Sequence, residues 1–177
     1  RALPEGYSID GWTGLRNSDG ELLYSAVWRN KAIMDTYEPG STFKSITTAM
    51  ALEEDVVGLD TVVDDLPVTV FGAAIHCWSK EYPHGTETFL QAVYNSCNPV
   101  FVKISHLIGI KTFYEYVESF GFKNYSGIEL AGEGKSIFHD DPTKLDMSVA
   151  SFGQRFQITP IQMVAAYNAI ANGGYLI

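Results

Sequence analysis

Apolar residues recur at helical spacing through most of the chain after residue 40. Side chains at i, i+3, i+4 and i+7 share one face of a helix, so this pattern predicts amphipathic helices that bury that face. Serine, threonine or proline ahead of most stretches, and glycine behind several of them, indicate where the helices begin and end. The predicted helices cover residues 41–54, 88–95, 99–109, 113–121, 143–151 and 160–172.

Outside the predicted helices, the pattern of apolar and polar residues is weaker and indicates loops with few strands. Residues 1–25 are rich in Gly, Ser, Asp and Asn and show little periodicity, which is typical of an irregular lead-in. Short apolar runs at 68–71 and 73–77 are broken at Gly72 and fit a small hairpin, although runs of this length do not separate helix from strand. The sequence therefore predicts a mainly α domain of five or six helices with at most a minor hairpin.

Composition places the chain among ordinary globular domains. It has 177 residues, of which 46% are apolar, enough for one hydrophobic core. With 12 Lys and Arg against 21 Asp and Glu, the formal charge is -9, and no basic stripe could neutralise phosphates, which argues against nucleic acid as a partner. No apolar run reaches the roughly 20 residues that span a bilayer. The chain begins at Arg1 rather than Met, which indicates a piece of a longer protein.

Ser41 and Lys44 form the first candidate reactive pair. Ser41 follows Pro39-Gly40 and begins a predicted helix, where free backbone N–H groups and the helix dipole favour developing negative charge. Lys44 follows three residues later on the same helix face and can activate the serine if burial or a nearby cation keeps it neutral. No histidine at a suitable spacing offers a more familiar base. The alternative is structural, with Ser41 as an N-cap and Lys44 as a solvated residue, although a cation in the first turn opposes the helix dipole.

A second polar motif, Ser96-Cys97-Asn98, falls in the elbow between two predicted helices. From such a turn Ser96 and Asn98 can point the same way, offering a hydroxyl for proton relay and an amide that holds a substrate carbonyl. The alternative is a polar connection between helices in which Asn98 acts as a cap. The motif alone does not separate these two interpretations.

Together with several other blocks in the same order, these motifs closely resemble class B penicillin-binding proteins, and most of all their cell-division and sporulation branch. The resemblance extends from about Trp28 to Gly174. A bare Ser-x-x-Lys would be weak support, whereas ordered blocks are far more specific than one short pattern. The blocks are Trp28-Arg29-Asn30-Lys31-Ala32, Tyr37-Glu38-Pro39-Gly40-Ser41-Thr42-Phe43-Lys44, His84-Gly85-Thr86, Asn95-Ser96-Cys97-Asn98-Pro99-Val100-Phe101, Ser151-Phe152-Gly153-Gln154 and Thr159-Pro160.

The resemblance implies the helical lobe of the α/β serine transpeptidase fold, which is β-lactamase-like, with most of the central antiparallel sheet missing from this chain. Residues 26–177 would form this partial transpeptidase domain, after the irregular lead-in of residues 1–25. The family also implies a place on the extracytoplasmic face of the bacterial cell membrane, with an anchor in an N-terminal segment outside this chain. The implied partners are a glycosyltransferase and the other proteins of the division complex, and no cofactor is implied.

The chemistry implied by the resemblance is peptidoglycan cross-linking by a D,D-transpeptidase. Ser41 would attack the D-Ala-D-Ala carbonyl of a stem peptide and form an acyl-enzyme, with Lys44 as the base for acylation. Ser96 would relay a proton to the leaving group, and Asn98 would bind the substrate amide. β-Lactam antibiotics would mimic the dipeptide and leave Ser41 acylated.

The chain departs from the family at its third motif, Lys-Thr-Gly, which has no match before Ile177. That motif normally lies on a strand beside the nucleophile and supplies an oxyanion N–H and a lysine for the substrate carboxylate. Because loss of one oxyanion donor costs about 10²–10³ in rate, we expect the fragment alone to be impaired. A smaller departure is Arg155, where related sequences usually carry glycine, and it either reshapes the loop or contacts substrate.

Two other functions stay open at this stage. One is a β-lactam sensor or binding domain that is acylated without turnover. The other is a serine β-lactamase, which needs a dedicated base for deacylation, but no Glu-x-x-Leu-Asn follows the second motif. The full-length gene sequence, read for an N-terminal anchor and a downstream Lys-Thr-Gly, would separate these functions from a transpeptidase.

Cys77 and Cys97 are the only cysteines and lack a Cys-x-x-Cys spacing. A reversible bridge between them would brace or distort the active-site elbow and control activity, and such a bond would persist outside the reducing cytosol. The alternative is two buried thiols. A zinc site made from His76, Cys77, His84 and Cys97 matches no common ligand spacing, so the sequence predicts no metal.

Overall fold

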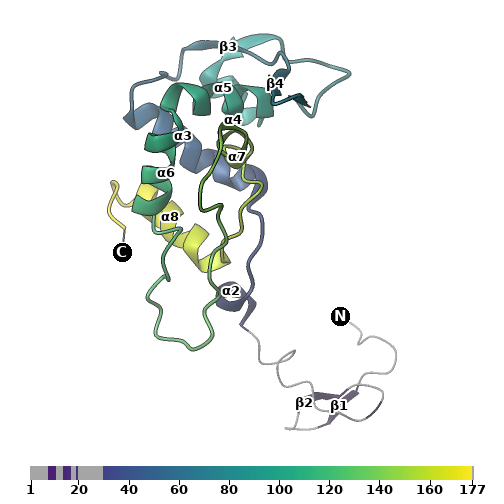
Figure 1. The fold of residues 1–177 in the computed structure, drawn as a ribbon, viewed down its shortest axis with the longest axis vertical. Helices are drawn as coiled ribbons and strands as arrows, with labels where there is room; N and C mark the ends of the chain where they lie inside the picture. The colour runs from purple at the N-terminus through teal and green to yellow at the C-terminus, as the bar shows by residue number, and fades with distance from the viewer. Residues whose placement is uncertain (1–7, 11–13, 17–18, 20–29, 177) are drawn as a thin grey trace.

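The predicted helices form, and local capping chemistry explains where several of them begin. Three start with a capping box, in which the threonine hydroxyl accepts a backbone N–H and the side chain three residues on bonds back. The structure is a computed structural model that describes residues 8–10, 14–16, 19 and 30–176, and Figure 1 shows its ribbon. The described helices are α2 (Lys31–Met34), the 3-10 helix η1 (Gly40–Phe43), α3 (Lys44–Glu53), α4 (Phe89–Tyr94), α5 (Asn98–Ile108), α6 (Ile110–Ser119), α7 (Lys144–Ala150) and α8 (Pro160–Ala171).

Strands in the described chain are short and occur only as antiparallel pairs. The predicted hairpin around Gly72 is confirmed, and its two turn residues, Phe71 and Gly72, have φ of 47° and 82°, as a two-residue hairpin turn of type I′ requires. The pairs are β1 (Ser8–Asp10) with β2 (Gly14–Arg16), β3 (Val62–Asp64) with β6 (Thr86–Thr88), and β4 (Val68–Val70) with β5 (Ala73–Ile75).

The mainly α prediction is confirmed, with three differences in detail. The four-residue helix α2 was not predicted, because so short a helix shows no periodicity. Where the structure describes the predicted irregular lead-in of residues 1–25, it contains the β1–β2 hairpin; the rest of that segment, apart from Asp19, lies outside the described residues. The β3–β6 pair, with Val62 opposite Thr88, was not predicted, because each strand has three residues and the two are far apart in sequence. None of the described helices is long and apolar enough to cross a membrane.

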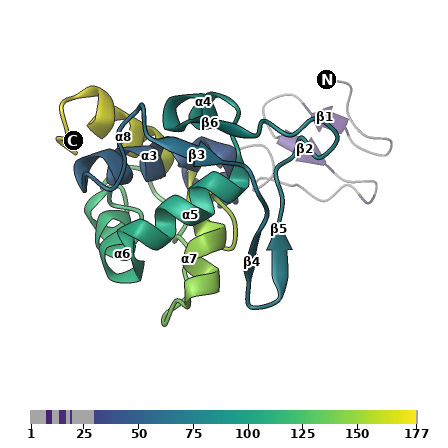
Figure 2. The same cartoon turned by 90° about the horizontal axis from the view of Figure 1, so that it is seen from above.

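The core lies directly beneath the turn that carries Ser41. Phe43 is fully buried and packs edge-on against Phe156, with ring centroids 4.8 Å apart, and against Phe122 at 5.4 Å. Helix α5 packs against α3, α6 and α7, while α8 packs against α3, as Figure 2 shows from above. Apolar side chains from all these helices therefore fix α3, and with it the turn that carries Ser41.

Candidate functional site

Ser41 sits in η1, which runs without a break into α3. Lys44, the first residue of α3, has helical backbone angles and donates its N–H to the carbonyl of Ser41. The Ser41 side chain is exposed, whereas Lys44 is only 4% exposed. Neither helix uses a serine cap, since Pro39 and Phe43 hold the cap positions without a side-chain bond. The structural alternative, an N-cap serine with a solvated lysine, is therefore wrong.

The ammonium of Lys44 joins the first motif to the second. Its Nζ donates to the Ser96 hydroxyl at 2.8 Å, to the Ser96 carbonyl at 2.6 Å and to the Asn98 side-chain oxygen at 2.6 Å. It also lies over the ring of Phe101, 5.3 Å from the centroid. Lys44 thus contacts two other predicted site residues, and Asn98 binds the lysine rather than capping its own helix.

Burial shifts the protonation of Lys44. Desolvation lowers its pKa from 10.5 to about 8, while the neighbouring Cys97 and Cys77 oppose the shift. A pKa near 8 leaves about one lysine in ten neutral at pH 7, a far larger share than an ordinary lysine offers. The neutral form that a general base requires is therefore accessible to Lys44 close to neutral pH.

The elbow that carries Ser96 is the C-terminal cap of α4. The N–H of Cys97 bonds to the carbonyl of Ala92 at 3.1 Å, and the N–H of Ser96 bonds to Val93 at 3.1 Å. This is a Schellman motif. Its penultimate residue must be left-handed, and Ser96 accordingly has φ of 53°. The backbone reversal aims both the hydroxyl and the carbonyl of Ser96 at Lys44.

Further contacts brace the elbow from the side. The amide of Asn95 donates to the buried carboxylate of Glu87 at 2.6 Å, and the indole N–H of Trp78 donates to the Asn95 carbonyl at 2.7 Å. The sequence gives no sign of a role for Glu87 or Trp78. Both come from the 62–88 region, which the sequence shows only as short mixed runs without a clear period.

Two glycines hold the loop after α7 against the turn that carries Ser41. The N–H of Gly40 donates to the carbonyl of Gly153 at 2.8 Å. A Cβ on Gly153 would lie 2.0 Å from the Gly40 carbonyl oxygen, and Gly153 also has φ of 83°. Only glycine fits at that position. The role was not predicted, although Gly153 belongs to one of the blocks in the sequence.

Tyr167 of α8 supports the same turn from the other side. Its hydroxyl donates to the carbonyl of Thr42, the residue after the nucleophile, at 2.8 Å. The Thr42 hydroxyl in turn donates to the carbonyl of Pro39 at 2.7 Å. The sequence showed Tyr167 only as an apolar position of a helix, because a tyrosine at helical spacing is more often a core residue.

Arg155 binds within the chain. Its guanidinium forms an ion pair with Asp146 at 2.9 Å, and its backbone N–H donates to Glu38 at 2.9 Å. Burial alone would raise the pKa of Asp146, but hydrogen bonds from Thr143, with His139 and Arg155 nearby, outweigh burial and lower it. Arg155 therefore holds the loop in place through Asp146 and Glu38.

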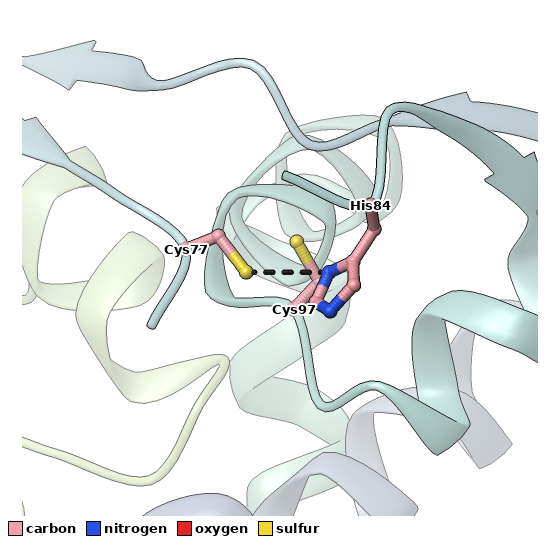
Figure 3. A group of neighbouring side chains, drawn as sticks. All are labelled: Cys77, His84 and Cys97. Carbon is pink, nitrogen blue, oxygen red and sulfur yellow. Dashed lines mark hydrogen bonds between the residues drawn. The ribbon is translucent and has the colours of Figure 1, made fainter. Parts of the chain in front are cut away.

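Both cysteines are buried and free, and they lie with His84 in one group. The ligand atoms of Cys77, His84 and Cys97 are all within 4.8 Å of one another. Burial, with a hydrogen bond to Cys77, raises the pKa of the Cys97 thiol to about 12. A Cys77–Cys97 bridge stays a prediction, as does the absence of a metal. Among the described residues, this is the group, drawn in Figure 3, whose ligand atoms lie close enough together to hold a metal.

Comparison with known proteins places the chain in one family. A family model for the penicillin-binding protein transpeptidase domain matches residues 8–177. Stage V sporulation protein D of Bacillus subtilis is 44% identical over 152 residues, a match that covers 84% of this chain and 23% of that protein. A peptidoglycan D,D-transpeptidase FtsI homolog of Mesostigma viride is 27% identical over 163 residues, covering 85% of this chain and 27% of that protein.

The solved structures agree on the fold. The transpeptidase domain of Burkholderia pseudomallei penicillin-binding protein 3, without ligand, superposes with a TM-score of 0.78 at 24% identity, covering 84% of this chain and 45% of that one. This likeness confirms the predicted fold class, the helical lobe of the transpeptidase fold. The chain spans about a quarter of the length of the two curated relatives.

Proposed function

The chain belongs to the transpeptidase family of penicillin-binding proteins, and on that premise we propose that it carries the nucleophile of a peptidoglycan D,D-transpeptidase, Ser41. One observation carries the proposal. Lys44 is almost fully buried one turn after Ser41 and binds both Ser96 and Asn98. A buried lysine with a lowered pKa, next to an exposed serine at a helix start, is an arrangement suited to activating the serine.

The first half-reaction is acylation of Ser41. The Ser41 oxygen attacks the carbonyl carbon of the penultimate D-Ala, and neutral Lys44 takes the hydroxyl proton. Ser96, which accepts a hydrogen bond from Lys44 at 2.8 Å, gives its proton to the leaving amine of the terminal D-Ala and takes the proton that Lys44 received, so that both residues end as they began. The peptide bond is replaced by an ester to Ser41. A β-lactam enters the same step, and its opened ring stays attached to the serine.

The second half-reaction transfers the acyl group to an amine of a neighbouring stem peptide. That amine attacks the ester, loses a proton and releases Ser41, so that one amide is exchanged for another. Asn98 holds the substrate amide in both steps. The substrate lies outside the cytoplasmic membrane, where we place the activity, and glycan strands made by a glycosyltransferase of the division or sporulation machinery supply it.

Mass spectrometry after exposure of the full-length protein to benzylpenicillin tests the proposal. Wild type is expected to gain one penicilloyl adduct on the peptide that contains Ser41, and Ser41→Ala is expected to gain none. Ser45→Ala removes the neighbouring hydroxyl on the same stretch of chain and should keep the adduct. An adduct retained in Ser41→Ala would refute the assignment, and rapid release with continued turnover of the drug would indicate a β-lactamase.

A further inference from the structure

Ser41 lies between two backbone groups that are tied to different parts of the chain. On its N-terminal side, the N–H of Gly40 donates to the carbonyl of Gly153 at 2.8 Å. On its C-terminal side, the carbonyl of Thr42 accepts the hydroxyl of Tyr167 at 2.8 Å. Because a trans peptide leaves only two soft dihedral angles per residue, these two bonds confine the backbone of Ser41 to a short stretch of freedom.

The hydrogen bonds around the Tyr167 hydroxyl have one consistent direction. Its oxygen is 2.8 Å from the Thr42 carbonyl oxygen and 2.9 Å from the Oγ of Ser45. A carbonyl oxygen can only accept, whereas a serine hydroxyl both donates and accepts. With its single hydrogen on the Thr42 carbonyl, the tyrosine hydroxyl accepts from Ser45. The bond to Thr42 therefore does not require the Ser45 hydroxyl.

The ring of Tyr167 is not a core side chain. It is 39% exposed, whereas Met163 and Ala166 of the same helix are 6% and 0% exposed. A phenylalanine would offer the same apolar surface to its neighbours. The part of this side chain that packing does not explain is its hydroxyl, which reaches the turn that carries Ser41.

The helix that carries Tyr167 is anchored away from that turn. Thr159 opens α8 with a capping box. The side-chain amide of Gln162, which is 3% exposed, donates to the carbonyls of Phe122 and Asn124 at 3.2 and 2.7 Å. Side chains that are locked in this way on a regular element hold a site more precisely than loops do. The Tyr167 hydroxyl is therefore attached to a rigid support rather than to the turn itself.

We propose that Tyr167 is a positioning residue for acylation of Ser41 and acts through the carbonyl of Thr42. This inference rests on the proposed function. Lys44 is held separately, by its bonds to the second motif. Loss of the Tyr167 bond would let the Ser41 hydroxyl move relative to the Lys44 amine that takes its proton. The distance for proton transfer would then lengthen while the base stayed in place.

Tyr167→Phe in the full-length protein tests the proposal, because it removes one oxygen and keeps the ring. Stopped-flow labelling over a range of benzylpenicillin concentrations separates the acylation rate constant from the dissociation constant of the noncovalent complex. We expect the rate constant per folded molecule to fall by about 10–100-fold, since a misplacement of about 1 Å can cost 100-fold. The dissociation constant should be nearly unchanged. Ser45→Ala should acylate at close to the wild-type rate, because it leaves the bond to Thr42 intact.

Tyr116→Phe is the matched control at the other end of α3. The Tyr116 hydroxyl donates to Glu54, the C-cap of that helix, at 2.7 Å. Its loss should destabilise the fold about as much as the loss of the Tyr167 hydroxyl, and it should leave the rate of acylation unchanged. Equal slowing in both variants would overturn the proposal, because it would reveal a general effect of stability.

Two further outcomes would also count against the role of Tyr167. One is an acylation rate in Tyr167→Phe equal to that of wild type. The other is a shift in the pH above which the rate levels off, since Lys44, with its pKa of about 8, stays the base in a purely positional variant. The adduct on Ser41 of the wild-type protein is scored separately. Failure of this proposal therefore leaves the Ser41 assignment standing, whereas absence of that adduct would remove both.

Discussion

A buried lysine is costly as an ammonium unless each of its N–H groups finds an acceptor. Lys44 meets that condition with three acceptors, all supplied by Ser96 and Asn98. The same burial lowers its pKa to about 8, so the charged and neutral forms are close in free energy near neutral pH. One residue can therefore both hold the second motif in place and accept a proton.

The rate of acylation should depend on pH through Lys44. Because the neutral amine is the base, the rate constant for acylation by a slow penicillin should rise about tenfold per pH unit below the pKa. It should level off above about pH 8, where Lys44 is deprotonated. Stopped-flow or quenched labelling between pH 6 and pH 10 measures the profile.

Lys44→Arg provides the control, since arginine stays protonated throughout this range. Loss of the general base should reduce the rate by about 10²–10⁴ and abolish the rise with pH. A wild-type rate that is flat with pH, or that rises only near pH 10.5, would contradict the role given to Lys44.

Gly153→Ala tests the close approach of two backbones under the nucleophile. The new Cβ would lie 2.0 Å from the Gly40 carbonyl oxygen, and backbone there cannot rotate away. We expect a loss of about 2–4 kcal/mol in the free energy of unfolding and slower acylation, because the turn that carries Ser41 must shift. Urea denaturation and penicillin labelling measure the two effects.

Gly72→Ala separates crowding from backbone strain. Gly72 has φ of 82°, against 83° for Gly153, but has no atom within 4 Å of a Cβ. The Gly72→Ala variant should lose only the strain of a left-handed alanine, about 1 kcal/mol in the free energy of unfolding, and its rate of acylation should be unchanged. Equal losses in the two variants would show that the Gly40–Gly153 contact is unimportant.

At the scale of elements, the helices after residue 40 were predicted to within a few residues because their ends carry strong local signals, whereas the short helix α2 was not predicted. Thr88, Thr143 and Thr159 open helices with capping boxes, and Pro160 occupies the first position of α8. Such signals act within one turn and so can be read from sequence. The β3–β6 pair could not be predicted, since its three-residue strands are fixed by each other across an intervening hairpin.

In the candidate site, too, local features could be predicted from the sequence and long-range contacts could not. Ser41 and Lys44 share one helical turn, and Ser96 and Asn98 share one elbow, so each pair was visible locally. That Lys44 bridges them depends on the packing of α3 against α5, and its burial could not be predicted from spacing. The partners of Arg155 were equally hidden, because Asp146 and Glu38 approach it from two other segments.

Replacing Arg155 should destabilise the loop after α7 in a way that depends on the replacement. Arg155→Ala removes the ion pair to the buried Asp146 and keeps the left-handed φ of 65°. The guanidinium is partly exposed, so the expected loss is about 1–2 kcal/mol. Arg155→Gly removes the same ion pair but relieves the strain, and should recover about 1 kcal/mol of that loss. Chemical denaturation of both variants at pH 7 makes the comparison.

The pH dependence gives this prediction a second test. The folded state lowers the pKa of Asp146, so the carboxylate contributes stability that is present above its ordinary pKa near 3.8 and is lost as the pH falls through the lowered value. The difference between wild type and Arg155→Ala should therefore shrink toward pH 2. A difference that is independent of pH would mean that Arg155 acts through packing alone.

At the scale of the whole molecule, the catalytic turn and the hydrophobic core are one continuous structure. Phe43 lies between Ser41 and Lys44 in sequence, and its ring packs against aromatic rings from α6, from the segment after α6 and from the loop before α8. The nucleophile helix is thus held by contacts from across the chain. Stability and chemistry can be separated only by a variant that changes the core while leaving both catalytic side chains in place.

Phe43→Ala and Phe43→Leu make that separation. Truncation of the fully buried ring to alanine should cost about 3–5 kcal/mol in the free energy of unfolding, a large share of the roughly 5–15 kcal/mol of a typical domain. Leucine fills most of the volume and should cost about 1–2 kcal/mol. Phe71→Ala, at a side chain that is 77% exposed, should stay within about 0.5 kcal/mol of wild type. Urea titrations with an unchanged m-value, and penicillin labelling per folded molecule, provide the measurements.

The outcomes separate two roles of the Phe43 ring. If Phe43→Leu keeps its stability but labels far more slowly, the ring positions Ser41 or Lys44 directly. If both variants match wild type in stability, the core does not lie where the structure has it.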